Sequence, residues 1–398
     1  MELEQIANKF GIDFNEVKER SDITKNIETL GNDLTFLNVR ESERTKHVHR
    51  LHPYLGKFVP QLVEVFLRKF FKRGDIILDP FVGSGTTSIE ANVLGMPSVG
   101  IELSPFNALI CKAKADKYDI NELRSELNDI LKKTKEFSEN LRKGVRVEKF
   151  TTESKYLNDW FAPVALQEIL FFRSKLQNYK YQDLFKIILS RSARSARLIT
   201  HYELARPKAP LKERYWCIKH KRYCIPTNEA FKFIWRYAWD TYYRIEEFSE
   251  IRNDVEMSII QGDSRFVDLP PSLKVDGIFT SPPYVGVIDY HEQHEYAYEL
   301  FGFPRLDTKE IGPAKKGQGW QSREDYSNDI IAVFNNIKRF LKSNAKVFIV
   351  ANDKFNLYTN IGKSCGFELI DTFNRPVLMR TTRTGKPYFE SIFYFRNK

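Results

Sequence analysis

A glycine-rich turn, Asp79-Pro80-Phe81-Val82-Gly83-Ser84-Gly85-Thr86-Thr87, carries the strongest local signal for chemistry in the sequence. It follows a short apolar run, and its glycines would let a ligand approach the backbone because no Cβ stands in the way. Three familiar turns of this kind do not match the sequence. A phosphate-binding loop needs a lysine after its last glycine, and a dinucleotide-binding fingerprint needs a third small residue. The nucleophile elbow of hydrolases needs the order Gly-x-Ser-x-Gly. The turn therefore predicts a ligand-binding loop of another kind.

A second stretch that could do chemistry is Thr280-Ser281-Pro282-Pro283-Tyr284. Two consecutive prolines fix φ and remove two N–H donors, so this corner would present rigid carbonyl acceptors. Ser281 adds a hydroxyl acceptor, and Tyr284 adds an aromatic face. Alone, such a corner could simply be a stiff exit from a strand, so its position relative to the glycine turn matters.

The elements that must position both stretches are alternating strands and helices from residue 75 onward. Strands are expected at 75–79, 98–102, 257–260, 276–280 and 346–350, with two final strands at 367–373 and 391–395 that could pair as a hairpin. Helices are expected from the glycine turn to Leu94 and at 104–116, 291–301 and 324–342. This order is typical of a doubly wound, mostly parallel α/β sheet with functional residues outside the carboxyl ends of its strands. We therefore expect the turn and the corner to share one crevice.

With that order of motifs, the chain resembles the amino-group DNA methyltransferases, which use S-adenosylmethionine. The turn at 79–87 is similar to their cofactor motif, and 281–284 to their Ser/Asp/Asn-Pro-Pro-Tyr/Phe catalytic motif. The run His52-Pro53-Tyr54-Leu55-Gly56-Lys57-Phe58-Val59-Pro60 resembles a cofactor-side motif of one subgroup, whose catalytic motif continues much as Asp289-Tyr290 and a helix with His294 do here. The resemblance covers residues 47–115 and 256–398, and it implies a Rossmann-like class I methyltransferase sheet of seven strands.

The resemblance also implies roles for single residues. Asp79 and the backbone of Gly83 to Gly85 would hold the methionine part of the cofactor. Glu102 would accept hydrogen bonds from the ribose hydroxyls, and Asp263 would contact the adenine amino group. The implied cofactor contacts are Lys57, Phe58, Asp79, Pro80, Phe81, Gly83, Gly85, Thr86, Glu102, Leu103 and Asp263, and the implied catalytic residues are Ser281, Pro282, Pro283 and Tyr284.

The expected reaction follows from the chemistry of an exocyclic base amine, which attacks poorly because its lone pair is delocalised into the ring. Ser281 and the Pro282 carbonyl can each accept an N–H bond, which localises the lone pair and stabilises the positive charge that develops on nitrogen. Tyr284 would stack on the base, which must first leave the duplex stack. Methylation at cytosine C5 is set aside, because that family uses a Pro-Cys pair and none of the four cysteines follows a proline.

The identity of the methylated base depends on Ser281, because a serine in front of Pro-Pro-Tyr is commoner in this family among cytosine-N4 enzymes. Cytosine N4 in duplex DNA is therefore favoured, within a restriction–modification system that would include a cognate restriction endonuclease. N6-adenine methylation is the alternative. An RNA methyltransferase is less favoured because no RNA-binding module is recognisable. A catalytically inactive DNA-binding protein is disfavoured by intact Asp79, Glu102, Ser281 and Tyr284.

The charge of the chain is concentrated in one segment. The formal net charge is +10, and residues 191–225 hold ten basic side chains against two acidic ones, with aromatic residues between them. Basic side chains displace counterions from phosphates, and aromatic faces stack on exposed bases. The expected DNA contacts are Arg191, Arg194, Arg197, Lys208, Lys212, Arg214, Lys221 and Arg222, with Arg380 and Arg383 near the C-terminus. We expect residues 116–255 to form an inserted, helical DNA-recognition subdomain and residues 1–45 a helical N-terminal segment, with 46–115 and 256–398 forming the catalytic domain.

The sequence gives only a weak signal for a metal site. Cys217-x-x-His220-x-x-x-Cys224 offers three zinc ligands, but a tetrahedral site needs a fourth and no partner pair follows at a suitable spacing. His47, His49 and His52 are attributed to the cofactor-side motif, so no metal is predicted. Four scattered cysteines, no run of ~18 apolar residues and no basic, apolar leader predict a cytoplasmic protein without a membrane span.

Overall fold

The computed structural model describes residues 34, 36, 39–54, 56, 59–204, 207–377 and 388–398. The helical prediction for the first 33 residues lies outside this part of the chain, as do the predicted cofactor contacts Lys57 and Phe58. The predicted DNA contacts Arg380 and Arg383 also lie outside it.

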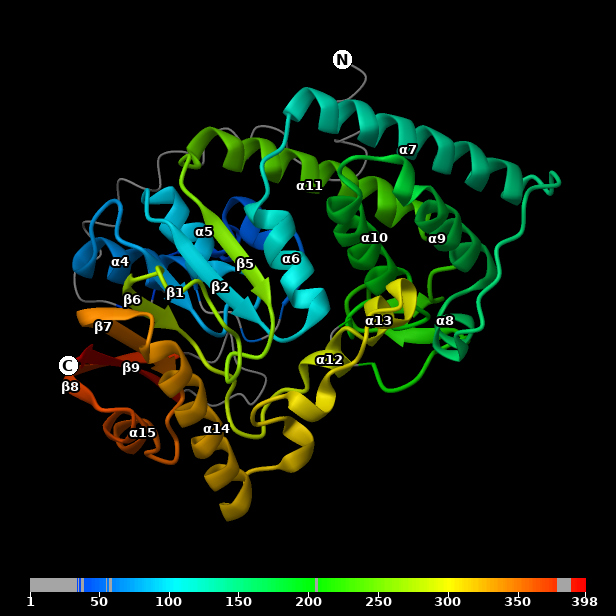
Figure 1. Ribbon diagram of the computed structural model, residues 1–398. Coiled ribbons are helices and arrows are strands. Elements are labelled where there is room, and N and C mark those ends of the chain that lie inside the picture. Colours follow the sequence, from blue (N-terminus) through cyan, green and yellow to red (C-terminus); the bar gives the residue numbers. More distant parts are fainter. Residues whose placement is uncertain are drawn as a thin grey trace.

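The core of the molecule is a seven-stranded sheet in the order β5-β2-β1-β6-β7-β9-β8 (Figure 1). Its strands are β1 (Ile77–Asp79), β2 (Ser98–Glu102), β5 (Met257–Gln261), β6 (Val275–Thr280), β7 (Leu341–Ala351), β8 (Phe367–Val377) and β9 (Tyr388–Asn397). The first five strands in this order pair in parallel, whereas β9 is antiparallel to both β7 and β8. The predicted doubly wound sheet with a terminal hairpin is confirmed.

Helices cover both faces of the sheet because successive strand residues point to opposite sides. Leu78, Ile278 and Val347 belong to one hydrophobic cluster with α14 (Trp320–Lys338) and α15 (Tyr358–Ser364). Their neighbours Ile77, Phe279 and Phe348 belong to another cluster with α4 (Pro60–Phe70) and α5 (Thr86–Val93). The strands are therefore packed between two hydrophobic layers, which hold the turns at the strand ends in place.

Three expected helices differ in their bounds. The helix expected at 104–116 is α6 (Pro105–Ala115), where the Ser104 hydroxyl caps the N-terminus by accepting from the Asn107 amide. The helix expected at 291–301 is broken at His294 into α12 (Tyr290–Gln293) and α13 (Glu295–Phe301). The helix expected at 324–342 ends at Lys338, because β7 already begins at Leu341.

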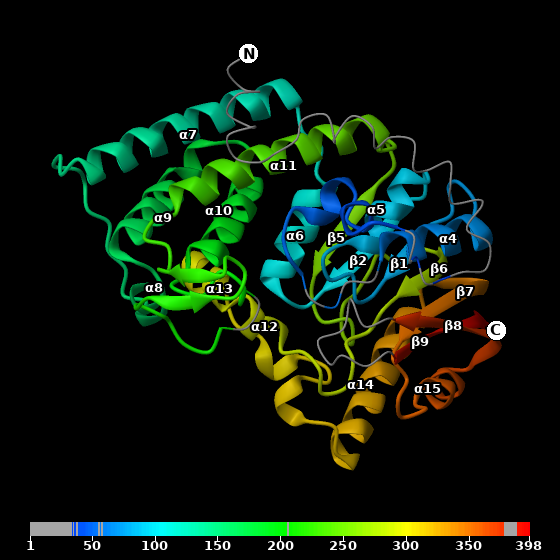
Figure 2. The ribbon, with the colours of Figure 1, turned by 180° about the vertical axis from the view of Figure 1, so that it is seen from behind.

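The segment between α6 and β5 is mostly helical and also contains a two-stranded hairpin. It comprises α7 (Ile120–Arg142), α8 (Lys155–Trp160), α9 (Pro163–Lys175), α10 (Gln182–Ala196), β3 (Tyr215–Cys217), β4 (Arg222–Cys224) and α11 (Phe231–Ile251). The view from behind shows this group beside the sheet, with α7 and α11 along its top (Figure 2). Its core is continuous with the sheet domain, since Phe106 of α6 and Tyr296 of α13 share a hydrophobic cluster with Phe185 of α10. No helix in the described part of the chain is long and apolar enough to cross a membrane.

Candidate active site

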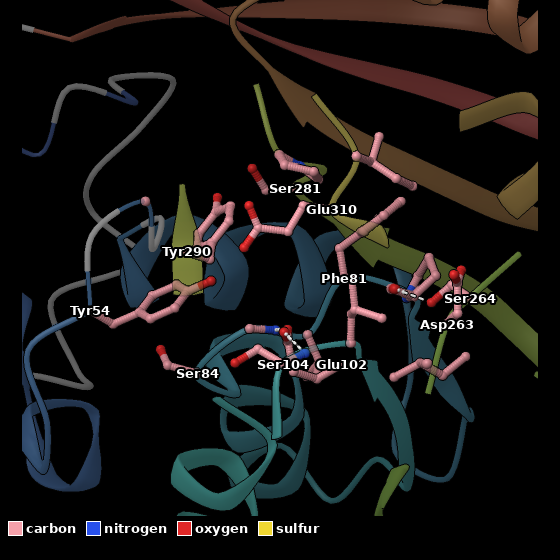
Figure 3. Close-up of a pocket in the computed structure, with 18 of the residues that line it drawn as sticks. Tyr54, Phe81, Ser84, Glu102, Ser104, Asp263, Ser264, Ser281, Tyr290 and Glu310 are labelled. Atoms are coloured by element: carbon pink, nitrogen blue, oxygen red, sulfur yellow. Dashed lines mark hydrogen bonds between the residues drawn. The ribbon is translucent and has the colours of Figure 1, made fainter. Parts of the chain in front are cut away.

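A pocket with an empty volume of about 830 Å³, partly open to solvent, lies at the carboxyl ends of β1, β2, β5 and β6. Phe81 and Gly83 of the glycine turn line it together with Ser281 and Pro283 of the proline corner. Figure 3 shows Ser281 on one side of the pocket, and Ser84 of the turn with Ser104 and Glu102 on the opposite side. The expectation that both stretches share one crevice is confirmed.

The glycine turn needs its glycines for two separate reasons. Gly83 and Gly85 have φ values of 53° and 89°, a region that side chains disfavour. A Cβ at Gly83 would lie 2.9 Å from the Tyr54 hydroxyl, and one at Gly85 would lie 2.6 Å from the Cys111 sulfur. Lys114 on α6 holds the turn in place by donating a hydrogen bond to the Ser84 carbonyl oxygen at 2.6 Å. Gly83 therefore borders the pocket, whereas Gly85, which is not among its lining residues, allows α6 to approach.

Asp79, a predicted cofactor contact, is hydrogen-bonded to neighbouring residues of the protein. Its carboxylate accepts from the Thr280 hydroxyl at 2.6 Å and from the Phe81 amide at 3.0 Å. The side chain is buried and is not among the residues that line the pocket. Burial raises the pKa of Asp79 to about 6, although the hydrogen bonds oppose this. Asp79 thus ties the end of β1 to the end of β6 and holds the turn against the corner.

Glu102 lies where the sequence predicts, at the carboxyl end of β2 and in the wall of the pocket. Its two oxygens accept from the backbone amides of Gly83, at 3.0 Å, and Ser104, at 2.8 Å. Burial raises the pKa of Glu102 to about 7, against the effect of these hydrogen bonds. The carboxylate joins the second strand to the glycine turn and still faces the pocket.

Asp263 lines one end of the pocket, beyond Phe81 (Figure 3). Arg265 donates two hydrogen bonds to the Asp263 carboxylate, from Nε at 3.0 Å and from Nη2 at 2.7 Å. It also donates a hydrogen bond to Asp329 at 2.6 Å. Ser264 anchors the same loop by donating to the Pro80 carbonyl at 2.6 Å. These hydrogen bonds hold the loop in place. Of the other predicted cofactor contacts, Pro80, Thr86 and Leu103 also line the pocket.

Several pocket residues were missed by the sequence interpretation. The rings of Tyr54 and Tyr290 stack with centroids 5.8 Å apart and close one end of the pocket (Figure 3). Glu310 bonds both the backbone amide of His291, at 3.0 Å, and its imidazole Nδ1. Tyr54 and Tyr290 lie within quoted motifs and could have been named from them. Glu310 follows no motif, so only the fold reveals it.

The proline corner divides its side chains between two pockets. Ser281 and Pro283 face the pocket described above, whereas Tyr284 lines a neighbouring one with an empty volume of about 390 Å³, together with Phe355 and Tyr358. The Tyr284 hydroxyl donates to Glu390 at 3.1 Å. The Pro283 carbonyl accepts from the Tyr326 hydroxyl at 2.9 Å, which fixes the wall between the two pockets. Pro282 is buried within the corner.

The basic segment separates into a buried and an exposed part. Arg191 is buried against Asp240, with 2.5 Å between Nη1 and Oδ2, and Arg197 is buried with a bond to the Leu204 carbonyl at 2.7 Å. Arg194 is half-buried, and desolvation lowers its pKa. These three arginines of the α10 region therefore do not form the exposed basic surface that the sequence predicted. The other described candidates, Lys208, Lys212, Arg214, Lys221 and Arg222, are all exposed.

The residues of the first pocket fit the expected cofactor. Gly83 leaves room that a Cβ would fill, and Glu102 presents a carboxylate at the floor. The buried hydroxyl of Ser84, in the pocket wall, has no hydrogen-bond partner among the described residues. A polar ligand that supplies hydroxyl donors and an acceptor would satisfy these groups.

Comparison with known proteins places these features in a family. A family model described as DNA methylase matches residues 7–113. The chain is 43% identical to the Type II methyltransferase M.MjaII of Methanocaldococcus jannaschii, over 91% of this chain and 82% of that protein. It is 28% identical to M.BsoBI of Geobacillus stearothermophilus over 37% of this chain and 29% of the relative, and 23% identical to M.MvaI of Kocuria varians over 66% and 58%. The chain belongs to the Type II DNA methyltransferases that act on amino groups and use S-adenosylmethionine.

Proposed function

We propose that this enzyme methylates the N4 amine of cytosine at a specific site in duplex DNA. The observation that carries the proposal is the shared pocket, in which Ser281 faces the glycine turn. In the resemblance drawn from the sequence, a serine at this position favours cytosine N4. The family assignment supports a DNA amino group as the acceptor.

The proline corner acts by holding hydrogen-bond acceptors still. Thr280 is tied to Asp79 on one side of the corner, and the Pro283 carbonyl is tied to Tyr326 on the other. Ser281 between them accepts an N–H bond from the amine, and the Pro282 carbonyl accepts the second. Bound S-adenosylmethionine supplies an electrophilic methyl group on sulfonium. Because the acceptors are fixed before the reaction, no reorganisation is needed as positive charge develops on nitrogen.

The second pocket is the place that we assign to the flipped base. Tyr284 and Phe355 line it, and Tyr284 follows directly after Pro283, which lines the cofactor pocket. An extruded cytosine stacks on Tyr284 there, with its amine directed toward Ser281. Unpairing and unstacking cost a few kcal/mol, which this stacking and the two amine hydrogen bonds offset.

The exposed basic residues of 208–222 are the surface that we assign to DNA backbone contacts. Lys221 and Arg222 belong to the β3–β4 hairpin, where Trp216 and Tyr223 are exposed by 54% and 63%. Cations with exposed aromatic rings are typical of nucleic-acid surfaces. A restriction endonuclease that cleaves the same site is the partner that we expect for such an enzyme.

The test is nucleoside mass spectrometry. Duplex DNA is incubated with the protein and methyl-labelled S-adenosylmethionine, digested and analysed, with transfer RNA and the Ser281→Ala variant in parallel. We expect labelled N4-methyldeoxycytidine from DNA alone. Labelled N6-methyldeoxyadenosine as the sole product would replace the base assignment with the adenine alternative, and labelled transfer RNA without labelled DNA would overturn the DNA substrate.

A further inference from the structure

Four side chains converge in the basic segment, away from the active site. They are His201, in the loop after α10, Cys217 at the end of β3, His220 in the hairpin turn and Cys224 at the end of β4. Their ligand atoms all lie within 4.8 Å of one another. Both thiols are buried and free of disulfides.

The spacing of these atoms matches the edges of a tetrahedron. Zn–N bonds of ~2.0–2.1 Å and Zn–S bonds of ~2.3 Å imply N···N edges of about 3.3 Å and N···S edges of about 3.5 Å. The two imidazole Nδ1 atoms are 3.2 Å apart. Three sulfur-to-Nδ1 distances are 3.4, 3.6 and 3.8 Å.

Hydrogen bonding alone does not account for this convergence. Nδ1 of His220 lies near three atoms at once: Nδ1 of His201 and the sulfurs of Cys217 and Cys224. A neutral imidazole nitrogen carries one hydrogen or one lone pair, so it cannot bond three such partners well. A shared central cation would take one lone pair from each group.

The described residues around the hairpin also lack a hydrophobic core. None of the described residues from 200 to 229 belongs to the three hydrophobic clusters. Trp216, Ile218 and Tyr223 are exposed by 54%, 67% and 63%. An isolated two-stranded hairpin is marginal in water, and small elements without a core are commonly fixed by a metal.

We propose that His201, Cys217, His220 and Cys224 bind a structural zinc ion that fixes the β3–β4 hairpin to the end of α10. Two thiolates and two imidazoles are ligands that zinc prefers, and four protein ligands leave no open position for catalysis. The sequence interpretation found three of the ligands. It missed His201 because this residue lies 16 positions before Cys217, at no recognisable motif spacing.

A second cluster, His47, His49 and Glu90, does not support the same inference. Lys46 already places its ammonium group 2.8 Å from Glu90 and supplies the positive charge there. Only three ligands are present in that cluster, and all three side chains are buried.

Elemental analysis of the full-length enzyme, purified without added metal or chelator, tests the zinc site. We expect about one zinc per chain, and cobalt(II) exchanged into the protein should give the intense visible absorption of a tetrahedral thiolate site. Cys217→Ser and Cys224→Ser should each lower the zinc content at least fivefold. Cys365→Ala, which removes the buried cysteine that directly follows α15, is the matched control and should keep its zinc.

Zinc below about one tenth per chain in the wild type, with no cobalt absorption, would overturn the proposal, as would unchanged zinc in both serine variants. Affinity for S-adenosylmethionine, measured on the same variants, checks that they are folded, because the cofactor pocket lies elsewhere in the molecule. Zinc content and cobalt absorption require neither DNA nor methyl transfer. Failure of the zinc site and failure of the proposed function are therefore distinguishable.

Discussion

The active-site edge of the sheet and the β3–β4 hairpin hold their functional residues by opposite means. At the sheet edge, Glu102 and Ser281 leave strands that are packed on both faces, and hydrogen bonds such as Thr280 to Asp79 join neighbouring strand ends. At the hairpin, Lys221 and Arg222 stand on a short two-stranded sheet outside the hydrophobic clusters. In the proposed function, the chemistry takes place on the rigid part of the molecule, and contact with the DNA backbone is made by a hairpin that depends on the proposed zinc site.

The arginines in and just after α10 show a related contrast within the basic segment. Arg191 and Arg197 have the same charge as Arg222, but they are buried, each bonded to an internal acceptor. The same residue type therefore supports packing at one end of the segment and presents charge to solvent at the other. Substitutions in each region should accordingly change different measured quantities.

The largest effect should come from Ser281→Ala, which removes an acceptor at the sheet edge. We expect kcat to fall about 10²–10³-fold, as for the loss of one preorganised group at a charged transition state. The affinity for S-adenosylmethionine should stay unchanged. Rapid-quench methyl transfer and equilibrium binding measure the two quantities. A fall in kcat of less than about threefold would show that the serine is not an important acceptor.

A slightly smaller effect is expected at the buried end of the basic segment. Arg191→Ala leaves Asp240, whose pKa the neighbouring arginines lower to about 2, with Arg244 as its remaining partner. We expect a loss of about 2–3 kcal/mol in the free energy of unfolding, measured by urea titration. If the variant kept its stability but bound DNA more weakly, Arg191 would belong to the exposed surface after all.

The next effect concerns cofactor binding and its pH dependence. Glu102→Gln should weaken S-adenosylmethionine binding about 10–100-fold at pH 8, because a charged acceptor is lost. Burial raises the pKa of Glu102 to about 7, so the carboxylate is protonated as the pH falls below that value. Wild-type affinity should therefore decrease between pH 8 and pH 6, and the Gln variant should show a flatter profile. Calorimetry with both proteins over this range gives the answer, and parallel profiles would exclude Glu102 as the titrating group.

The smallest effect is expected at the hairpin. Replacing Lys221 and Arg222 together by Ala should weaken DNA binding about 3–30-fold and reduce the salt slope of log K by about 2. Stability should not change, since both side chains are exposed. Fluorescence anisotropy at several salt concentrations measures the slope. A slope equal to that of the wild type would place the DNA on another face.

Much of the sheet edge could be predicted because it depends on local pattern. The strand at 98–102 was placed with its observed bounds, and Glu102 and Ser281 were singled out because each lies at the carboxyl end of a strand. The glycine turn and the proline corner were correctly expected to line one crevice. The cofactor role of Asp79 stays a prediction, and the motif did not show that its carboxylate accepts from the Thr280 hydroxyl.

What the sequence did not show depends on contacts between distant segments. Burial of Arg191 is determined by Asp240 on α11, and the role of His201 depends on the course of the loop after α10. Tyr284 faces the second pocket because β9 supplies Glu390, far along the chain. Charge counts and motif spacing contain no information about such partners.

The most direct test of the shared crevice is a crystal structure of the enzyme with S-adenosylhomocysteine and a duplex that contains its target site. We predict that the ribose hydroxyls lie on Glu102, that the sulfur faces Ser281, and that a flipped cytosine places its N4 amine on the Ser281 hydroxyl. A cofactor product bound outside the pocket between Gly83 and Ser281, or a target amine directed away from Ser281, would contradict this arrangement.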